Sequence, residues 1–431
     1  MVMPPGPRIP AMVQTLRMQS DPLGFLGSAM KQFGEIFSIK VMAVGDVVVI
    51  TTPEMMEQVF TGPEDVVQGG AGQEMIEPAV GPHSIFLSDE EEHTRKRRIM
   101  LPPFHRQAVR RYAQEIDRVA ERHIASWPKN EPLDMRSRAQ DIAMEVIIRI
   151  IFGIRDDVRV AAIRDRLVAL RKPMHAVIMM PALRRELGPL SPWSVYRRRR
   201  AAVDEIIYSE IAAFRAEPDP ERDDFLATMV RARHSDGAAL TDDEIRDQLM
   251  SMLFAGQETT ALGMAWAIDL MAHHPDAMAR ARDDRDYLSA VIDETLRLRP
   301  PLFHVARRIS RPMTVGGYEL SAGTTVMVAI LLVHRQPGLY PAPDEFRPER
   351  FLGERPPRFG YVPFAAGARR CLGMHLATME LTIVLERLLR TMEVTAVRAK
   401  PDDPRLFHIT LVPRHGAQVR VRPRMPADQT V

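Results

Sequence analysis

The clearest pattern of hydrophobic and polar positions is a long run at helical spacing that follows Thr241. The letters T-D-D-E put Thr241 at a helix cap and Glu244 three residues later, which is a capping box. The run reaches His273 and His274 and stops at Pro275, because proline has no backbone N–H to donate inside a helix. It predicts one helix of about 32 residues, ~48 Å long, enough to cross a whole domain.

Shorter patterns predict further helices and a set of short strands. Apolar residues recur at helical spacing from Val109 to Ile124 and from Asp141 to Ile151. Alternating or β-branched runs predict strands near both ends of the chain, at residues 36–41, 47–51, 313–318, 324–328, 408–412 and 418–421. The expected fold class is therefore mainly α with small β-sheets.

No stretch of the chain has the composition of a linker between domains. The 431 residues contain no long Gly/Ser-rich or low-complexity segment and no repeat at solenoid spacing. We expect a single domain over residues 1–431, with residues 1–30 as an irregular, proline-rich N-terminal segment. A chain of this length can bury a core large enough to enclose a cofactor.

The N-terminus and the apolar runs argue against a membrane segment. Four of the first ten residues are prolines, which rules out the apolar core of a signal peptide or a membrane helix there. The longest apolar runs elsewhere, such as residues 326–333, fall short of the ~18 residues that a spanning helix needs. We expect a cytoplasmic protein without a membrane span.

Composition and charge narrow the possible functions only slightly. The chain is 45% hydrophobic and 26% charged, and its net charge of +2 gives no reason to expect nucleic-acid binding. The single cysteine, Cys371, can form no internal disulfide, which fits a reducing compartment. A lone cysteine is by itself most simply a small buried hydrophobic residue, so its neighbours decide its role.

The residues around this cysteine read F-A-A-G-A-R-R-C-L-G, from Phe364 to Gly373. Glycines let a backbone approach a flat ligand and turn sharply into the helix expected near Leu372. A helix N-terminus and two arginines stabilise a thiolate. A thiolate ligand pushes electron density toward haem iron and favours O–O cleavage.

The pattern F-x-x-G-x-R-x-C-x-G resembles the haem loop of the cytochrome P450 family. The resemblance implies that Cys371 is the axial ligand of the iron of haem b (iron protoporphyrin IX). It also implies that Phe364, Arg369 and Gly373 contact this cofactor. The alternative is an inert buried cysteine in a glycine-rich loop.

A second match joins E-T-L-R, residues 294–297, to P-E-R-F, residues 348–351. Residues three apart share a helix face, so Glu294 and Arg297 can hydrogen-bond, although such pairs are common on helix surfaces. In the family this pair and the arginine of the later motif, here Arg350, form a buried structural triad. We therefore expect these three residues to be scaffold and not catalysts.

Polar residues interrupt the apolar long helix at A-G-Q-E-T-T, residues 255–260. Glycine costs a helix about 1 kcal/mol relative to alanine, and an interior carboxylate costs free energy unless it is paired. The segment resembles the oxygen-binding groove of the family. This implies that Gly256 lines the groove beside the cofactor, that Thr259 hydrogen-bonds bound dioxygen, and that Glu258 takes part in proton delivery. The alternative is an amphipathic helix with an exposed Glu258.

Cationic residues at three places are candidates to bind the two haem propionates. His93 and Arg97 lie at i and i+4, so both side chains can reach one acidic group. In the family these positions contact a propionate, and the same matching implies that Arg307 and Arg369 are further partners. The alternative for residues 93–97 is a solvated basic run.

The resemblance covers roughly residues 30–425 and implies an oxidoreductase, a haem-thiolate monooxygenase with the P450 fold. Such an enzyme activates O₂ with electrons from NAD(P)H and hydroxylates or epoxidises a lipophilic small molecule. One cysteine cannot hold a Cys₄ cluster, so we expect a separate ferredoxin-like electron donor with its reductase. The alternatives are a peroxide-driven peroxygenase or isomerase, whose relatives typically lack the acid–alcohol pair, and a non-catalytic haem-binding protein.

Two segments, residues 66–86 and 171–196, are expected to be lids over a substrate site. Flexible apolar side chains can adapt to a ligand, and candidates here are Met174, Ile178, Met179, Met180 and Leu183. Further candidates to line the site are Leu302, Phe303, Val305, Leu406, Phe407 and Ile409. They favour a terpenoid, steroid or fatty-acid-like substrate, and ordinary core packing would explain the same residues nearly as well.

A cationic face is expected near the cysteine, where an acidic electron donor would dock. Charge complementarity raises association rates, and less so at high salt. The candidates are Lys96, Arg98, Arg110, Arg111 and Arg370. The alternative is a solvated face of no consequence.

Overall fold

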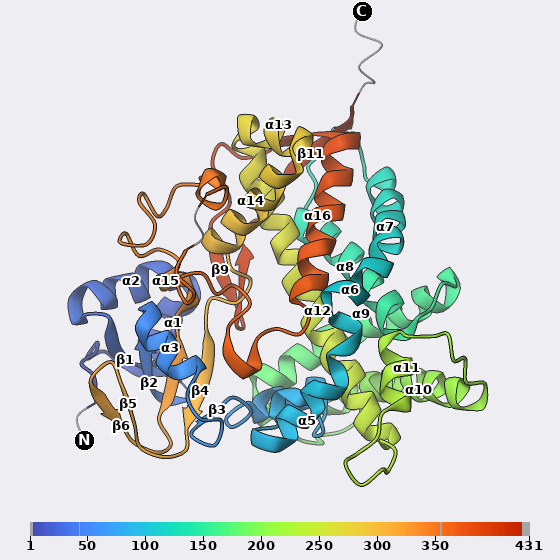
Figure 1. The fold of residues 1–431 in the computed structure, drawn as a ribbon, viewed down its shortest axis with the longest axis horizontal. Helices are drawn as coiled ribbons and strands as arrows, with labels where there is room; N and C mark the ends of the chain where they lie inside the picture. The colour runs from blue at the N-terminus through green and yellow to red at the C-terminus, as the bar shows by residue number, and fades with distance from the viewer. Residues whose placement is uncertain (1–2, 43, 354–355, 425–431) are drawn as a thin grey trace, which may run out of the picture. The chain divides into compact units, whose positions relative to one another are not determined.

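The computed structural model describes residues 3–42, 44–353 and 356–424 (Figure 1). The chain divides into two compact units, which are described separately. Unit 1 comprises residues 1–68, 113–142 and 259–431, and unit 2 comprises residues 69–112 and 143–258. Neither unit is one continuous segment, and the single domain expected over residues 1–431 stays a prediction.

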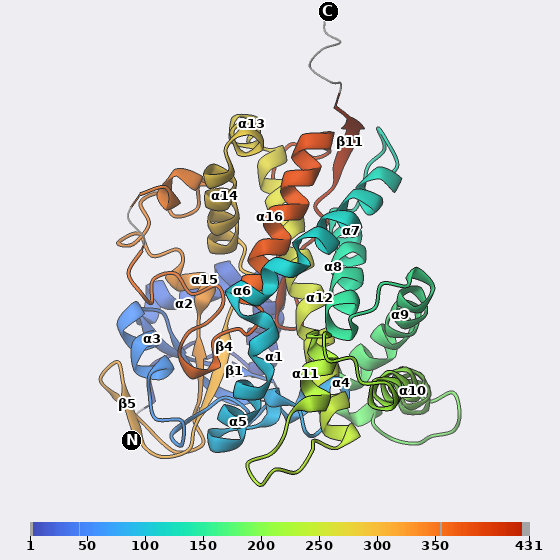
Figure 2. The ribbon, with the colours of Figure 1, turned by 45° about the vertical axis from the view of Figure 1, so that its right-hand side comes forward.

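Unit 1 combines helices with all of the named strands. Its helices are α1 (Ala11–Ser20), α2 (Pro22–Phe33), α3 (Pro53–Phe60), α7 (Ala113–Ser126), α13 (Pro275–Asp283), α14 (Arg285–Leu298), α15 (Ile330–Val333) and α16 (Met374–Thr391). Short 3-10 turns lie at Pro348–Phe351 and Gly367–Arg369. Helices α7 and α16 lie side by side in both views (Figures 1 and 2).

The strands of unit 1 form a mixed sheet and three small ribbons. The sheet has the order β1 (Ile36–Val41), β2 (Gly45–Ile50), β7 (Thr325–Val328), β4 (Val305–Ile309), β3 (Val67–Gln68), with only the β2–β7 pair parallel. The antiparallel ribbons pair β5 (Met313–Val315) with β6 (Tyr318–Leu320), β9 (Pro404–Phe407) with β10 (Thr410–Pro413), and β8 (Met392–Ala396) with β11 (Val419–Pro423).

Unit 2 is helical in its named elements. It contains α4 (Glu77–Val80), α5 (Glu90–Met100), α6 (Arg106–Val109), α9 (Asp157–Met179), α10 (Pro192–Ala216) and α11 (Phe225–Arg231). Its 3-10 turns lie at Glu74–Ile76, Ile85–Leu87, Pro102–Phe104, Arg110–Tyr112 and Pro181–Leu183. Two long helices, α8 (Met135–Phe152) and α12 (Asp242–Ala272), have residues in both units.

Local sequence explains where several of these helices begin. Thr52 accepts a hydrogen bond from the Met55 amide at the start of α3, and Asp156 does the same for two amides at the start of α9. At α12 the capping box forms as expected: the Glu244 amide donates to Thr241 Oγ1 over 3.2 Å, and the Thr241 amide donates to Glu244 over 2.8 Å.

The apolar cores of unit 1 lie on the two faces of the mixed sheet. Strand residues alternate between faces, so Val48 and Ile50 of β2 join one cluster and Val47 and Val49 join the other. Phe60 at the end of α3 belongs to the first cluster. This core fixes β4 and the end of α3, which both reach the candidate site.

The structure confirms most elements expected from the pattern and corrects others. Helix α12 has 31 residues, and β1 has the expected bounds. The expected irregular segment over residues 1–30 is wrong from Ala11 onward, because α1 and α2 form there. The run 313–318 is two strands with a turn at Gly316 and Gly317, which both have positive φ.

Among the described residues, no helix is long and apolar enough to span a bilayer.

Candidate functional site

The cysteine loop, residues 364–373, is stabilised by hydrogen bonds within its own backbone. The Cys371 amide donates to the Phe364 carbonyl over 3.0 Å, and the Arg370 amide donates to the Gly367 carbonyl over 3.1 Å. Helix α16 begins at Met374 with Gly373 as its N-cap, two residues later than expected. Cys371 itself is exposed. A thiol thus lies just before a helix N-terminus, where a thiolate is stabilised.

Gly367 is required by its surroundings. Its φ is +73°, and a Cβ at this position would lie 2.0 Å from the Phe60 carbonyl oxygen. A residue with a side chain would therefore be strained and would also collide with backbone. The same Phe60 lies beside Arg307 of β4, whose guanidinium carbon is 5.7 Å from the ring centroid. The end of α3 thus brings the cysteine loop and Arg307 to one place.

The expected scaffold triad is confirmed. Arg297 of α14 donates to both carboxylate oxygens of Glu294, over 2.7 and 2.9 Å, and neither side chain is exposed. Arg350 lies 3.4 Å from the same carboxylate. Arg297 Nη1 also donates to the carbonyls of His334 and Pro343, both over 2.7 Å. Such a buried pair is costly to break, because the remaining charge would be left without a partner.

His334 connects this triad to the cysteine loop, and the sequence motifs did not identify it. The Val362 amide donates to His334 Nε2 over 2.9 Å, so Nδ1 carries the proton and faces the Arg297 carbonyl, 3.3 Å away. Burial lowers the pKa of His334 to about 3, which keeps the ring neutral. The Val362 carbonyl in turn accepts from the Ala365 amide, next to Phe364. The triad therefore supports the loop through a chain of hydrogen bonds.

The segment expected to bind oxygen is regular α-helix. Three of its residues are half-buried: Gly256, Glu258 and Thr259. The alternative, in which Glu258 is exposed, is therefore wrong. A Cβ on Gly256 would lie 2.8 Å from Ile147 Cδ1, so this glycine allows close packing of α12 on α8 within unit 2. The boundary between the units falls between Glu258 and Thr259.

The cationic candidates lie on separate elements. His93 is buried and Arg97 is half-buried on α5 in unit 2, one helical turn apart. Arg307 on β4 and Arg369 in the cysteine loop are half-buried in unit 1. Within unit 1, Phe364, Arg369, Cys371 and Gly373 lie in the cysteine loop, and Arg307 lies against Phe60, which this loop also approaches at Gly367.

His304 is a further candidate that sequence reasoning missed. It directly precedes β4, and its Nδ1 is buried with no hydrogen-bond partner among the described residues. Burial lowers the pKa of His304 to about 4, so the ring is neutral and still carries one N–H donor. In the tautomer with the proton on Nδ1, this nitrogen is a buried donor that fits an acidic group of a bound cofactor. The only sequence signal was its position three residues before Arg307.

The residues present fit haem. A thiol at a helix N-terminus is a suitable iron ligand, and the cations of β4 and of the loop suit carboxylates. The glycine at position 367 brings backbone close to backbone, which keeps the loop tight. The unpartnered nitrogen of His304 adds a donor for an acidic group.

Two other expectations about side chains are corrected. Lys96 is not part of a cationic surface: it is 9% exposed and forms an ion pair of 2.6 Å with Glu92. Phe303 does not line an open site, because it is 1% exposed inside the core of the sheet.

Comparison with known proteins agrees with these observations. The profile of the family described as Cytochrome P450 matches residues 3–421. Cytochrome P450 135B1 of Mycobacterium tuberculosis is 37% identical over 98% of this chain and 92% of its own length. Cytochrome P450 137 of the same species is 39% identical over 91% of this chain and 84% of its own length.

Solved structures show the same fold. A structure described as retinoic acid bound cyanobacterial CYP120A1 has a TM-score of 0.85 at 23% identity, and covers 98% of this chain and 99% of its own. The heme domain of cytochrome P450DA also has a TM-score of 0.85, at 22% identity, with 98% of each chain covered. The expected mainly helical P450 fold is confirmed. The chain belongs to the cytochrome P450 family, the haem-containing oxidoreductases whose members act as monooxygenases.

Proposed function

We propose that this enzyme inserts one atom of O₂ into a lipophilic small molecule of terpenoid, steroid or fatty-acid-like type, by hydroxylation or epoxidation. The second oxygen atom leaves as water. The electrons come from NAD(P)H through a ferredoxin-like protein and its reductase, and the enzyme works in the cytoplasm. We infer this lipophilic substrate class from the apolar side chains that surround the α12 segment before Glu258.

Bound haem supplies the iron at which O₂ is activated. Cys371 holds the iron as a thiolate, which the start of α16 stabilises. Arg307, Arg369, His93 and Arg97 bind the propionates, with Phe364, Gly373 and Gly256 in contact with the cofactor. His304 donates its unpartnered N–H to an acidic group of the cofactor.

Glu258 and Thr259 move the protons that the reaction consumes. Neighbouring positions on one helical turn can pass a proton from a carboxyl group to a hydroxyl group. Glu258 takes up protons from solvent, and Thr259 Oγ1 holds a proton at the oxygen-binding groove. Both side chains are half-buried, which suits groups that must meet both solvent and substrate.

An apolar cluster in unit 2 supports a lipophilic substrate. Its buried members are Ala79, Val80 and Ile178, and its partly buried members are Ile76, Phe86, Leu87, Met174 and Phe254. Phe254 is one helical turn before Glu258, so the two share a face of α12. The cluster joins α4, α9 and α12, which correspond to both expected lids and the oxygen segment. Met180 is excluded from this role because it is 56% exposed, and the side chain of Met179 lies outside what the structure describes.

A panel of lipophiles tests the substrate class. A terpenoid, steroid or fatty acid that enters the site should shift the spin state of the haem iron, seen as a shift of the Soret band. Met174→Asp should weaken that shift, because a carboxylate in the apolar cluster costs free energy. No shift with any lipophile, together with a shift for small polar molecules, would contradict the proposal.

The source of oxidising equivalents distinguishes this function from the peroxide-driven alternative. The holoenzyme should form product with O₂ and a reducing system. Product formed only with added peroxide would identify a peroxygenase or isomerase, and no product under either condition would indicate a haem-binding protein without catalysis.

A further inference from the structure

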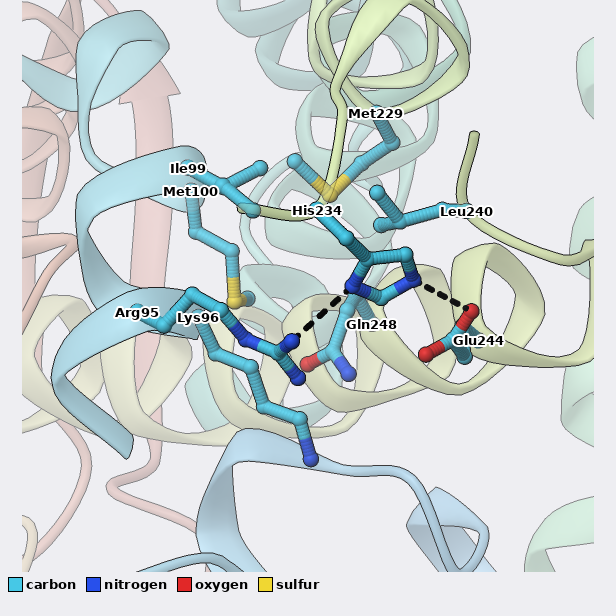
Figure 3. A pocket seen from close by; sticks show the side chains of 9 residues that line it. All are labelled: Arg95, Lys96, Ile99, Met100, Met229, His234, Leu240, Glu244 and Gln248. Carbon is cyan, nitrogen blue, oxygen red and sulfur yellow. Dashed lines mark hydrogen bonds and ion pairs between the residues drawn. The ribbon is translucent and has the colours of Figure 1, made fainter. Parts of the chain in front are cut away.

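A side-chain chain of three residues joins α5 to the start of α12 within unit 2 (Figure 3). Arg95 Nη1 lies 3.0 Å from His234 Nδ1, and His234 Nε2 lies 3.2 Å from Glu244 Oε2. These residues surround a cavity of about 20 Å³, which is room for one water and no organic ligand. The cluster therefore holds segments together and does not bind a substrate.

His234 sits in a short hairpin between α11 and α12. Its amide donates to the Ala238 carbonyl over 2.8 Å, and the Gly237 amide donates to the His234 carbonyl over 3.0 Å. The isolated bridge between Arg233 and Ala239 closes this hairpin. The imidazole is 19% exposed. The backbone thus fixes where the ring can point.

The two neighbours of the ring specify its neutral form. A guanidinium can only donate, so Nδ1 must accept from Arg95. Glu244 is then the acceptor for the Nε2 proton. Burial alone would raise the pKa of Glu244, but hydrogen bonds from Thr241 and His234 outweigh it and hold this pKa below its usual value, so the carboxylate is charged.

A proton added to His234 would break its hydrogen bond with Arg95. A proton on His234 Nδ1 would point at the cationic Arg95 and remove its acceptor, while the contact with Glu244 would become an ion pair. Among the described residues, His234 is the hydrogen-bond partner of Arg95, and the structure gives it no ion pair. The hydrogen bond from α5 to the hairpin therefore depends on the charge of one histidine.

We propose that His234 is a positioning residue whose neutral form holds α5 against the hairpin and whose protonated form releases it. Helix α5 also carries His93 and Arg97, on either side of Arg95 in sequence. The consequence for cofactor binding rests on the proposed function. The latch itself, which is the hydrogen bond between Arg95 and His234, does not. Acid would thus loosen the helix that is proposed to hold a propionate.

The charged groups that face the ring are few. Arg95 and Lys96 come from α5, and Lys96 is already paired with Glu92. Glu244 comes from α12. Within the hairpin, the Asp236 carboxylate accepts from the Ala238 amide, and Arg233 donates to backbone carbonyls. The helix α11 contributes only Met229 to the cavity lining.

Hydrogen exchange of the holoenzyme tests the latch. Between about pH 8 and about pH 5.5, the protection factors of α5 should fall on the order of tenfold, as expected for one lost charge-assisted hydrogen bond. Amides of α9, another helix of unit 2 that does not line this cavity, serve as the internal reference and should keep their protection factors.

Matched variants separate the loss of the Arg95–His234 hydrogen bond from other effects of acid. His234→Gln retains a donor and an acceptor but cannot titrate, so α5 should stay protected at both pH values. Arg95→Leu keeps apolar bulk without a donor, so α5 should be weakly protected at both. His105→Gln removes an exposed histidine of unit 2 and should behave as the wild type.

Two results would overturn the proposal. One is a wild-type α5 whose protection factors do not change between the two pH values. The other is a fall of the same size in His234→Gln. Neither measurement uses turnover, so a failure of the proposed oxygen insertion would leave this result unaffected.

Discussion

At the scale of single residues, the least expected group is a buried acid. Glu380 of α16 is 3% exposed, and its Oε1 has no hydrogen-bond partner among the described residues. Burial raises its pKa well above the usual value, so the folded state keeps this proton where the unfolded chain loses it. The folded state then binds more protons, and the free energy of unfolding falls as pH rises above ~4.3.

Replacing this acid should remove its contribution to the pH dependence of stability. Glu380→Gln should be more stable than the wild type at about pH 8 and similar to it near pH 5, since each raised pKa unit is worth about 1.4 kcal/mol. Urea unfolding of the holoenzyme at both pH values measures the difference. Glu319→Gln, an exposed acid of unit 1, is the control. Equal pH dependence in wild type and Glu380→Gln would be inconsistent with a buried protonated carboxyl group.

A glycine in the cysteine loop gives a second prediction at this scale. Gly367→Ala should lower stability by at least about 1–3 kcal/mol, the cost of a strained backbone conformation, and should also displace the loop from the Phe60 carbonyl. Haem content and the Soret band of the reduced CO complex report on the loop. Gly338→Ala is the matched control, because nothing lies within 4 Å of the added Cβ. Unchanged haem content and stability in Gly367→Ala would contradict this account.

At the scale of elements, α12 combines packing with the proposed chemistry. Gly256 packs against α8 and Gly263 against Leu381 of α16, where a Cβ would lie 3.1 Å from Leu381 Cδ2. Two glycines that are required for close helix packing, Gly256 and Gly263, therefore flank Glu258 and Thr259. The pair can therefore be altered separately from the glycines that seat the helix.

Removal of the Thr259 hydroxyl should uncouple the enzyme without unfolding it. Thr259→Ala should bind haem and consume NAD(P)H, yet form less product and more peroxide per electron, because no hydroxyl holds a proton at the groove. Product and peroxide yields per NAD(P)H measure the coupling. Thr259→Ser restores the hydroxyl and should restore much of it. Full coupling in Thr259→Ala would exclude the proposed role of Thr259.

At the scale of the whole molecule, the net charge is small, and any strong electrostatic attraction must come from local groups of charged side chains. The net charge is +2, so attraction of an acidic donor depends on particular exposed arginines. Arg98 and Arg110 of unit 2 and Arg370 of unit 1 are exposed. Lys96 is buried and Arg111 is paired with Asp223, so these two contribute less than the sequence suggested.

The rate of the first electron transfer from an acidic ferredoxin should therefore fall as salt rises. Arg110→Glu should lower the rate several-fold at low salt and flatten its dependence on ionic strength. Arg405→Glu reverses an exposed charge that is not among the proposed docking residues, and it should have little effect. A wild-type rate that does not change with salt would exclude electrostatic docking and leave the family assignment intact.

The sequence by itself determined the features that depend on neighbours along the chain. The capping box at Thr241, the extent of α12 and the Cys371 loop follow from local hydrogen bonding, helical spacing and backbone conformation, which a short segment encodes. Only the tertiary structure decided which distant residues meet. His334 under the cysteine loop, Phe60 beside Gly367, the unpartnered Nδ1 of His304 and the burial of Lys96 result from packing of segments far apart in sequence. No local pattern records such contacts, because burial and hydrogen-bond partners are properties of the assembled core.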